Sequence, residues 1–238
     1  CGAGRHQHHS RLAAKTVSSQ VKAAVMGLEI ERKYLHVNLQ NLRQVLVDNG
    51  AHCLGAHFEC NWVFDTAQGA LVTGGKLLRL RSQEWQDKTR HLITLKLPAT
   101  EDGGFKVREE RETEVADGAA LRGILEGLGY TVAARYEKVR EPWRMDTVEV
   151  ELDALPFAQV VELEGRAQDI ARVEKRLNLD NAEISIKSYH ELHQEWLRQN
   201  NKPKQLSFVF DEAQRAHWRT VLGLTDKADV NTDSSRQS

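Results

Sequence analysis

The stretch Gly27-Leu28-Glu29-Ile30-Glu31-Arg32-Lys33-Tyr34-Leu35 alternates charged and mostly apolar side chains with a period of two. Two residues is the repeat of a β-strand, in which successive side chains point to opposite faces of the sheet. Glu29, Glu31 and Lys33 therefore share one face of a predicted strand. A single strand of this kind usually has one face in the core and the other in water. Whether this usual explanation holds for the present strand depends on how often the pattern recurs along the chain.

The same alternation of charge recurs in nearly all of the remaining strands that the sequence predicts. Hydrophobic period and turn residues place these strands at about 52–65, 76–82, 90–97, 105–115, 130–141, 144–153 and 157–164. The face that holds Glu149, Glu151 and Asp153 is wholly acidic, whereas the face that holds Arg79 and Arg81 is wholly basic. Independent solvated faces would not be expected to separate charge in this way. We therefore expect these faces to line one shared, enclosed channel.

The opposite faces of these strands are largely apolar and need a cover, which amphipathic helices can supply. Helices are predicted at 38–48, 118–128, 167–178, 188–200 and 211–222. Short turns between successive strands indicate antiparallel pairing. If the helices cover the apolar faces, the charged faces belong either to an open solvated sheet or to the interior of a closed one. A closed sheet of about eight strands encloses a space that fits a small ligand.

A closed interior lined by these residues must be wet and internally paired, because an unpaired buried charge is costly. It must also bind something that carries both signs of charge. A polyanion with divalent cations meets this requirement, since carboxylates coordinate the metal while lysines and arginines bind phosphate oxygens. Glutamates are hard oxygen ligands that suit Mg²⁺.

The composition is that of a soluble globular protein, with 40% hydrophobic residues and a mean hydropathy of −0.54. The formal net charge of −1 provides no overall field that would attract nucleic acid or a membrane surface. No apolar run approaches the roughly 18 residues of a membrane-spanning helix. With no secretory signal recognised either, a cytoplasmic location is the default expectation. The three cysteines have neither metal-site nor disulfide spacing and are predicted to be free thiols.

Four segments are predicted along the chain. Residues 1–25 are polar and basic and are expected to be a flexible extension. Residues 26–200 are expected to form one domain. Residues 201–224 are predicted to be a helical extension that either caps this domain or mediates contact in a homodimer. Residues 225–238 lack apolar periodicity and are predicted to be disordered.

Nine short motifs occur in one order along the chain. They are Glu29-x-Glu31-x-Lys33, Phe64-Asp65-Thr66, Leu78-Arg79-Leu80-Arg81, Thr94-Leu95-Lys96-Leu97-Pro98, Arg108-x-Glu110-x-Glu112, Glu137-Lys138-Val139-Arg140, Glu151-Leu152-Asp153, Val161-Glu162-Leu163-Glu164-Gly165 and Lys187-Ser188-Tyr189. The ordered set resembles the CYTH superfamily of triphosphate tunnel metalloenzymes. The lone E-x-E-x-K motif is weak evidence, whereas the whole set is strong. The region 128–165 looks most like the group of class IV adenylyl cyclases and thiamine triphosphatase-like enzymes.

The resemblance implies an α+β fold, in which an eight-stranded antiparallel closed β-barrel with helices packed outside binds a triphosphate and Mg²⁺ or Mn²⁺ in its tunnel. The metal ligands that it implies are Glu29, Glu31, Glu110, Glu112, Glu151, Asp153, Glu162 and Glu164. The phosphate-binding residues that it implies are Lys33, Arg79, Arg81, Lys96, Arg108, Lys138, Arg140 and Lys187. Catalytic roles are implied for Lys33, Glu31 and Glu112. The implied substrates are tripolyphosphate, ATP or thiamine triphosphate.

One position departs from the family pattern. Many members have a tyrosine before the Asp-Thr pair, and in some triphosphatases this tyrosine is proposed to work with the motif lysine in acid–base chemistry. Here the residue is Phe64. Activation of water by metal, with Glu31 or Glu112 accepting the proton, is therefore the favoured mechanism, and Lys33 is expected to bind phosphate.

A metal-dependent triphosphatase is the favoured function. A class IV adenylyl cyclase shares every motif, because only the bound pose differs when the ribose 3′-hydroxyl of ATP attacks the α-phosphorus. A module that binds polyphosphate or nucleotide without turnover is the third hypothesis. Processing of RNA 5′-triphosphates gets no support, since the sequence has no extended basic patch.

Overall fold

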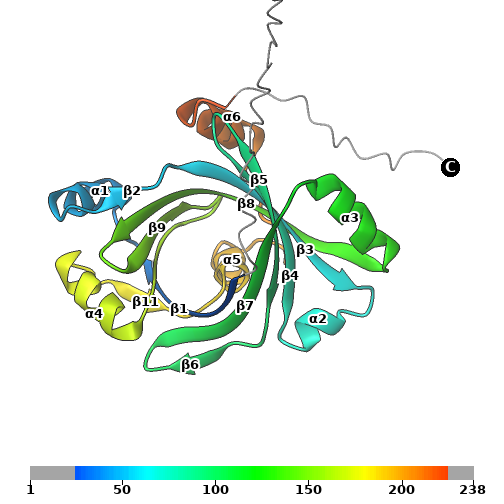
Figure 1. Ribbon diagram of the computed structural model, residues 1–238, viewed down its shortest axis with the longest axis horizontal. Coiled ribbons are helices and arrows are strands. Elements are labelled where there is room, and N and C mark those ends of the chain that lie inside the picture. The colour runs from blue at the N-terminus through cyan, green and yellow to red at the C-terminus, as the bar shows by residue number, and fades with distance from the viewer. Residues whose placement is uncertain (1–24, 225–238) are drawn as a thin grey trace, which may run out of the picture.

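Eight antiparallel strands close into a barrel in the computed structural model, which describes residues 25–224 (Figure 1). Around the ring the strands follow the order β1, β10, β9, β8, β3, β4, β5, β7 and back to β1. Their bounds are β1 Val25–Leu35, β3 His57–Thr66, β4 Leu77–Glu84, β5 Thr89–Lys96, β7 Phe105–Val115, β8 Tyr130–Met145, β9 Val148–Ala154 and β10 Gln159–Glu164. The predicted eight-stranded closed barrel is confirmed.

Helices surround the barrel, as predicted (Figure 1). Their bounds are α1 Leu39–Asp48, α2 Ala70–Thr73, α3 Gly118–Gly127, α4 Ala167–Arg176, α5 Tyr189–Gln199 and α6 Glu212–Val221. In the view along the barrel, α5 is seen within the ring, whereas the other helices lie outside it. Helix α1 begins where the sequence predicts, because the side chain of Asn38 accepts a hydrogen bond from the backbone N–H of Asn41.

Strand β1 closes the ring because it pairs along both of its edges. One edge pairs with β10, and the first half of the other edge pairs with β7. Glu31 lies at the point where both neighbours meet, opposite Glu164 on β10 and Lys106 on β7. The short strand β11, Glu183–Ser185, pairs with the second half of β1. The stretch that opens the sequence is thus the seam of the barrel.

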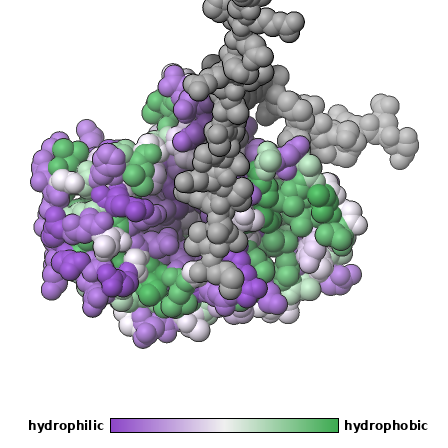
Figure 2. Space-filling model, in the orientation of Figure 1, coloured by the Kyte–Doolittle hydropathy of each residue, from purple (hydrophilic) through white to green (hydrophobic). Residues whose placement is uncertain are grey.

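The apolar faces of the strands point outward and are covered by the helices. The largest core cluster packs α1 and α4 against β9 and β10, with Leu42, Val150, Leu163 and Ile170 all almost fully buried. A second cluster packs α3 against β3 and β4 around Phe64. The α3 side remains partly apolar at the surface, where hydrophobic residues gather at the right of Figure 2. The arrangement leaves the charged faces to line the interior.

The structure differs from the prediction at two strand boundaries. The strand predicted at 52–65 is split into β2, His52–Cys53, and β3, because the backbone turns at Gly55 with a positive φ of 96°. The break predicted between 141 and 144 does not occur. Strand β8 continues through Pro142, whose carbonyl accepts a hydrogen bond from the N–H of Leu54, and turns only at Asp146 with a φ of 54°.

Three short elements were not predicted: α2, β11 and the strand β6, Thr100–Asp102. Each has four residues or fewer, which is too short for a hydrophobic period to show in the sequence. The two predicted tails lie outside the described residues, except for Val25. None of the helices in residues 25–224 is both long enough and apolar enough to cross a membrane.

The segment 201–224 packs on the outer wall of the barrel. Phe210, Trp218 and the residues around them contact Phe58 of β3 and Val139 of β8. The fully buried carboxylate of Glu137 binds this segment, since it accepts hydrogen bonds from the N–H of Phe210 and from the guanidinium of Arg215. Helix α6 therefore has a defined place against the barrel, and a role for it in a homodimer stays a prediction.

We expect Ile170→Ala to destabilise the protein by about 2–5 kcal/mol, because Ile170 is fully buried between α4 and the sheet. The matched control is Ile124→Ala on α3, where the side chain is 59% exposed, and it should change stability by less than about 0.5 kcal/mol. Chemical denaturation measures both values. Equal effects of the two substitutions would contradict this view of the core.

Candidate functional site

The barrel encloses a cavity of about 590 Å³ that is lined mainly by ionisable side chains. Eight carboxylates line it: Glu29, Glu31, Glu110, Glu112, Glu149, Glu151, Glu162 and Glu164. Nine lysines and arginines line it as well: Lys33, Arg79, Arg81, Arg90, Lys96, Lys106, Arg108, Lys138 and Arg140. The near balance of the two signs is what allows so many charges to share one enclosed space.

The two signs of charge are separated around the ring. The charged residues that the adjacent strands β9 and β10 contribute to the cavity are all carboxylates, whereas those of β4 and β8 are arginines and a lysine. Strand register then sets acids against bases, as with Lys33 opposite Glu162 and Asp153 opposite Arg140. The cavity therefore has an acidic wall and a basic wall that meet in ion pairs.

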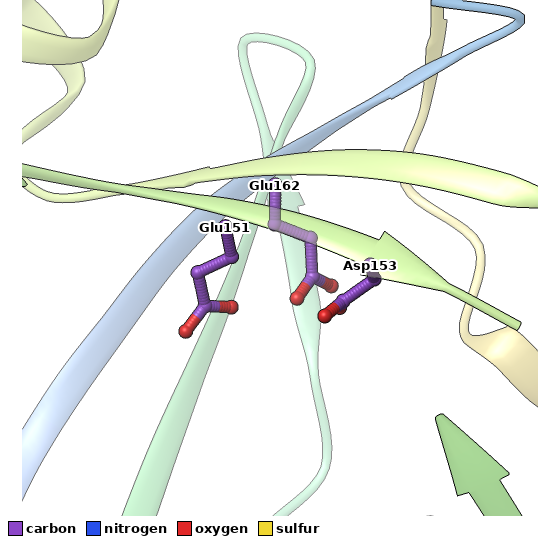
Figure 3. Close-up of side chains that lie close together, drawn as sticks. All are labelled: Glu151, Asp153 and Glu162. Atoms are coloured by element: carbon purple, nitrogen blue, oxygen red, sulfur yellow. The ribbon is translucent and has the colours of Figure 1, made fainter. Parts of the chain in front are cut away.

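Arg140 is the centre of the first group of ion pairs. Its guanidinium contacts Asp153 at 2.8 and 2.5 Å, Glu162 at 2.6 Å, and Glu151 as well. Figure 3 shows the three carboxylates side by side, two from β9 and one from β10. Burial raises the pKa of Glu151 well above its usual range, and the nearby carboxylates add to this effect. Lys138 pairs with Asp153 at 2.9 Å and Lys33 with Glu162 at 2.7 Å, so Glu151 is the carboxylate of this group that a further positive charge would stabilise most.

Lys33 joins the acidic wall to strand β1. Its ammonium nitrogen lies 2.7 Å from an oxygen of Glu31 and 2.7 Å from an oxygen of Glu162. Burial by itself would lower the pKa of Lys33, but the two carboxylates outweigh burial and raise the pKa above its ordinary value. Lys33 therefore stays charged at neutral pH and cannot act as a general base there. Lys106 contacts the same oxygen of Glu31 at 2.8 Å.

A second group of ion pairs surrounds Lys96. Its ammonium nitrogen contacts both oxygens of Glu29, at 2.7 and 2.8 Å, and one oxygen of Glu110 at 2.7 Å. Glu164 lies close to this group and has no ion-pair partner among the described residues. Burial, followed by the charge of Glu29, raises the pKa of Glu164 to about 8. Carboxylate charge is therefore in excess on this side of the cavity too.

The acidic wall fits a divalent cation by the chemistry of its ligands. Oxygen atoms of Glu151, Asp153 and Glu162 lie within 4.8 Å of one another, which is a spacing that a single ion can bridge. Carboxylate oxygens are the ligands that Mg²⁺ and Mn²⁺ prefer. The raised pKa of Glu151 and of Glu164 also fits a cation, because a bound positive charge would counter the burial, and the neighbouring carboxylates that add to it, which together favour the protonated form of these groups.

The basic wall holds arginine donors that have no partner. Arg79 donates to the hydroxyl of Tyr136 at 3.1 Å and to that of Thr94 at 3.2 Å, yet its buried Nε has no acceptor within the described chain. Arg81 is held by Asn61 at 2.8 Å and by Glu59 at 3.2 Å. Arg108 forms no ion pair with any described residue, and its Nε is also buried without a partner. These unused donors are suited to an anion with several oxygens.

A comparison with protein families matches residues 27–197 to the CYTH domain. The chain belongs to the CYTH domain family. The match covers every strand of the barrel and the helices from α1 to α4, together with most of α5. No match was found among curated proteins.

Several solved structures share the fold of this CYTH domain. The PH1819 protein from Pyrococcus horikoshii has 21% sequence identity and a TM-score of 0.61, with 70% of this chain and 98% of that chain covered. A candidate adenylate cyclase from Vibrio parahaemolyticus has 22% identity, a TM-score of 0.57 and coverage of 70% and 97%. A candidate adenylyl cyclase from Hippeastrum has 20% identity, a TM-score of 0.53 and coverage of 75% and 98%. At these identities the likeness shows the fold.

The CYTH barrel brings nearly all of the predicted site residues together in the cavity. Two of them do not line it. Asp153 is fully buried behind Arg140 and Lys138, and its oxygens accept hydrogen bonds from both. The Lys187 side chain is 47% exposed, and its ammonium group contacts Glu195 of α5 at 2.6 Å. Phosphate contact by Lys187 would require its side chain to leave Glu195.

Sequence reasoning missed several residues of the site. The two-residue period places Glu149 and Lys106 on inward faces, but the sequence assigned neither of them a role, and both line the cavity. Glu59 is fully buried and contacts Arg81 at 3.2 Å and Lys138 at 3.6 Å. Burial alone would raise the pKa of Glu59, but Arg81 and Lys138 hold it well below its usual range. No local motif marks this residue, because its partners come from other strands.

Phe64 occupies the position at which many members of the family have a tyrosine. Phe64 is almost fully buried in the apolar cluster under α3, outside the cavity. A different tyrosine, Tyr189 at the start of α5, lies over Lys33 with 5.5 Å between the ammonium and the ring centroid. Its hydroxyl donates to Asp153. Burial and then Asp153 raise the pKa of Tyr189 well above its ordinary value, so it remains a neutral hydrogen-bond donor.

We predict that Glu164→Gln weakens the pH dependence of stability in protein treated with EDTA. The pKa of Glu164 in the folded state, about 8, exceeds its pKa in the unfolded state. At pH values between these two pKa values, the folded state therefore holds one more proton than the unfolded state. That stabilising proton is lost as pH rises through about 8, and the wild type should lose stability there. The amide of the substituted side chain cannot titrate, so the variant should lose less.

Denaturation midpoints from about pH 6 to about pH 9 test this difference. Glu114→Gln is the matched control, because Glu114 is half exposed and pairs with Arg90 outside the acidic wall. The control should keep the pH dependence of the wild type. Identical profiles for the wild type and Glu164→Gln would show that Glu164 is ionised in the cavity at neutral pH.

Proposed function

We propose that this CYTH protein hydrolyses a triphosphate, with the help of a divalent cation, inside the barrel. The observation that carries the proposal is the pair of arginines whose buried Nε has no partner, Arg79 and Arg108, which line the same cavity as the acidic wall. An anion alone would satisfy only the basic wall. A cation alone would satisfy only the acidic wall. A triphosphate together with Mg²⁺ or Mn²⁺ satisfies both.

The phosphate chain would lie along the basic wall. Arg79, Arg81 and Arg108 offer planar guanidinium groups, which can bind two phosphate oxygens at once. Lys138 and Arg140 extend this surface toward the acidic wall, and each is already oriented by a carboxylate. Because Glu59 and Asn61 hold Arg81 in place, little side-chain entropy is lost when it binds phosphate.

The cation would be held on the acidic wall by Glu29, Glu31, Glu151, Glu162 and Glu164, with Glu110 and Glu112 beside them. The oxygens of Asp153 lie close to those of Glu151 and Glu162, but Arg140 and Lys138 already donate to them, so Asp153 would act by orienting these two cations beside the site. When bound, such a cation neutralises phosphate charge and makes a water molecule a better nucleophile.

In the proposed reaction, water attacks the terminal phosphorus and the bond to the bridging oxygen breaks. A carboxylate accepts the proton of the attacking water. Glu112 is the better placed of the two predicted acceptors, because it is more exposed to the cavity, whereas Glu31 already accepts contacts from Lys33 and Lys106. Lys33 stays protonated and stabilises negative charge on phosphate oxygens.

One of the related structures favours hydrolysis over cyclisation. The related structure from Hippeastrum is described as that of a candidate adenylyl cyclase with a dominant triphosphatase activity. The arrangement of charges in the present cavity is equally suited to binding without turnover. The three functions therefore differ in their products, and a product assay separates them.

We expect the protein to release orthophosphate from tripolyphosphate or ATP when Mg²⁺ or Mn²⁺ is present, and to lose this activity in EDTA. Chromatography should resolve orthophosphate, pyrophosphate and cyclic AMP. Cyclic AMP with pyrophosphate would instead identify a cyclase. Binding of triphosphates with no product from any of them would identify a binding module.

Arg108→Met should lower kcat/KM by about 100-fold, because it removes an unpaired cation from the basic wall. Methionine keeps much of the length of the side chain, and no ion pair within the barrel is broken. The matched control is Arg122→Met on α3, whose partner Glu126 lies on the same helix at the surface. An unchanged kcat/KM in Arg108→Met would place the phosphate chain elsewhere.

A further inference from the structure

The basic wall also carries a phenol hydroxyl that no sequence motif marks. Tyr136 of β8 lines the cavity, although only 5% of its surface is exposed. It shares the inner face of β8 with Lys138 and Arg140, because the three residues are spaced two apart. Its hydroxyl accepts a hydrogen bond from the guanidinium of Arg79 on β4 at 3.1 Å. A phosphate bound by Arg79 would therefore lie within reach of this hydroxyl.

The proton of the Tyr136 hydroxyl is not used by the protein. A guanidinium group only donates hydrogen bonds, so the contact with Arg79 occupies a lone pair of the hydroxyl and leaves its proton free. No residue within 25–224 accepts that proton. The other tyrosine that lines the cavity in this part of the chain is Tyr189, whose hydroxyl already donates to Asp153. Because a buried tyrosine hydroxyl usually has a hydrogen-bond partner, the free proton of Tyr136 is suited to a ligand.

The ring of Tyr136 is held where the charged cavity meets an apolar cluster. It stacks on Phe208 with 5.0 Å between the ring centroids, and His190 of α5 packs edge-on against it at 5.3 Å. The fully buried Val160 belongs to the same cluster. Burial lowers the pKa of His190, so its imidazole is neutral at neutral pH. These contacts restrict the ring, so little side-chain entropy would be lost when the hydroxyl meets a ligand.

The charges that act on Tyr136 most strongly are positive. Arg79 and Arg81 face it from β4, and Lys138 faces it from β8. The acid on the neighbouring strand β3, Glu59, is already paired with Arg81 and Lys138. Burial by itself would raise the pKa of Tyr136, but the three cations outweigh burial and lower the pKa below its ordinary value. The same cations would stabilise a tyrosinate, so this phenol can give up its proton more readily than one in water.

We propose that Tyr136 is the general acid of the hydrolysis: its hydroxyl gives a proton to the bridging oxygen that leaves the terminal phosphorus. This inference rests on the proposed function and adds a catalytic residue to it. As water forms its bond to phosphorus, the bond to the bridging oxygen breaks and its electron pair goes to that oxygen. The proton of Tyr136 moves onto the same oxygen, and the proton of the water moves to Glu112. After the products leave, Glu112 releases its proton and Tyr136 regains one from solvent water.

The leaving oxygen is the place where a proton has most effect. The transition state of phosphoryl transfer is loose, so negative charge builds up on the leaving group as its bond breaks. The arginines of the basic wall attract this charge but do not give up a proton. Lys33 also keeps its proton, because Glu31 and Glu162 raise its pKa. A positioned general acid contributes about 100-fold to about 10,000-fold in rate.

The test begins with Tyr136→Phe in the full-length protein, which removes the hydroxyl and keeps the ring. Activity is measured across pH with the triphosphate that the wild type hydrolyses best. We expect kcat/KM to fall by about 100-fold, chiefly through kcat, because the proton is given only in the transition state. In the wild type, kcat/KM should also fall at alkaline pH as Tyr136 ionises, since an acid must hold its proton to act. The variant should lack this fall.

A change of leaving group separates proton donation from packing. In an analogue of the same triphosphate, a CH₂ group replaces the oxygen between the two phosphorus atoms that leave together, which makes the leaving oxygen more basic. A more basic oxygen depends more on a proton donor, so the loss in Tyr136→Phe should be larger with the analogue. Tyr130→Phe is the matched control, because Tyr130 lies on the same strand but packs in the apolar cluster under α3, outside the cavity. It should leave kcat/KM and the pH profile unchanged.

Ultraviolet absorbance of tyrosinate provides a readout without substrate. The difference between the titrations of the wild type and Tyr136→Phe reports this one phenol, and it should move to higher pH when Arg79→Met removes a neighbouring cation. Equal losses in Tyr136→Phe with the triphosphate and its analogue would show a role in packing or binding and would overturn the inference. Hydrolysis by the wild type that Tyr136→Phe leaves intact would reject the acid alone. No hydrolysis of any triphosphate by the wild type would reject the proposed function itself.

Discussion

Pairing of opposite charges across a closed sheet is the constraint on which this structure depends. Each strand turns its ionisable face inward, and closure of the ring removes those faces from bulk water. An isolated buried ion would be costly. The strand register offsets this cost, because it places Glu29 opposite Arg108 and Lys33 opposite Glu162. A slip of one residue in any strand would break these pairs and turn an apolar face into the cavity. Register and charge pairing therefore support each other.

Stability and function are assigned to different faces of the same strands. Buried ion pairs are weak sources of stability, because desolvation offsets much of their attraction. The apolar clusters between the barrel and its helices are the better source, and many of their side chains are fully buried. Because the apolar clusters stabilise the fold, the inner faces of the strands can carry an excess of carboxylate at Glu164 and an unpaired guanidinium at Arg108. These unsatisfied groups are what a ligand would satisfy.

Along strand β4 the cavity changes character. Arg79 and Arg81 present guanidinium groups, and the same inner face then presents Gln83 and Trp85. The proposed phosphate contacts of β4 thus share one straight element, so their spacing would be set by the rise of a β-strand rather than by a mobile loop.

The amino-acid sequence determined which residues face inward, because a period of two assigns alternate side chains to opposite faces of a strand. It also determined several helix ends, as the cap at Asn38 shows. It did not show that Glu59 holds Arg81 and Lys138, or that Lys187 turns to Glu195. Nor did it show that the indole N–H of Trp85 points to the carbonyl of Gly55. Those facts were decided by the tertiary structure, because local pattern selects the face of a strand, whereas the register between strands and the closure of the ring select which side chains become neighbours.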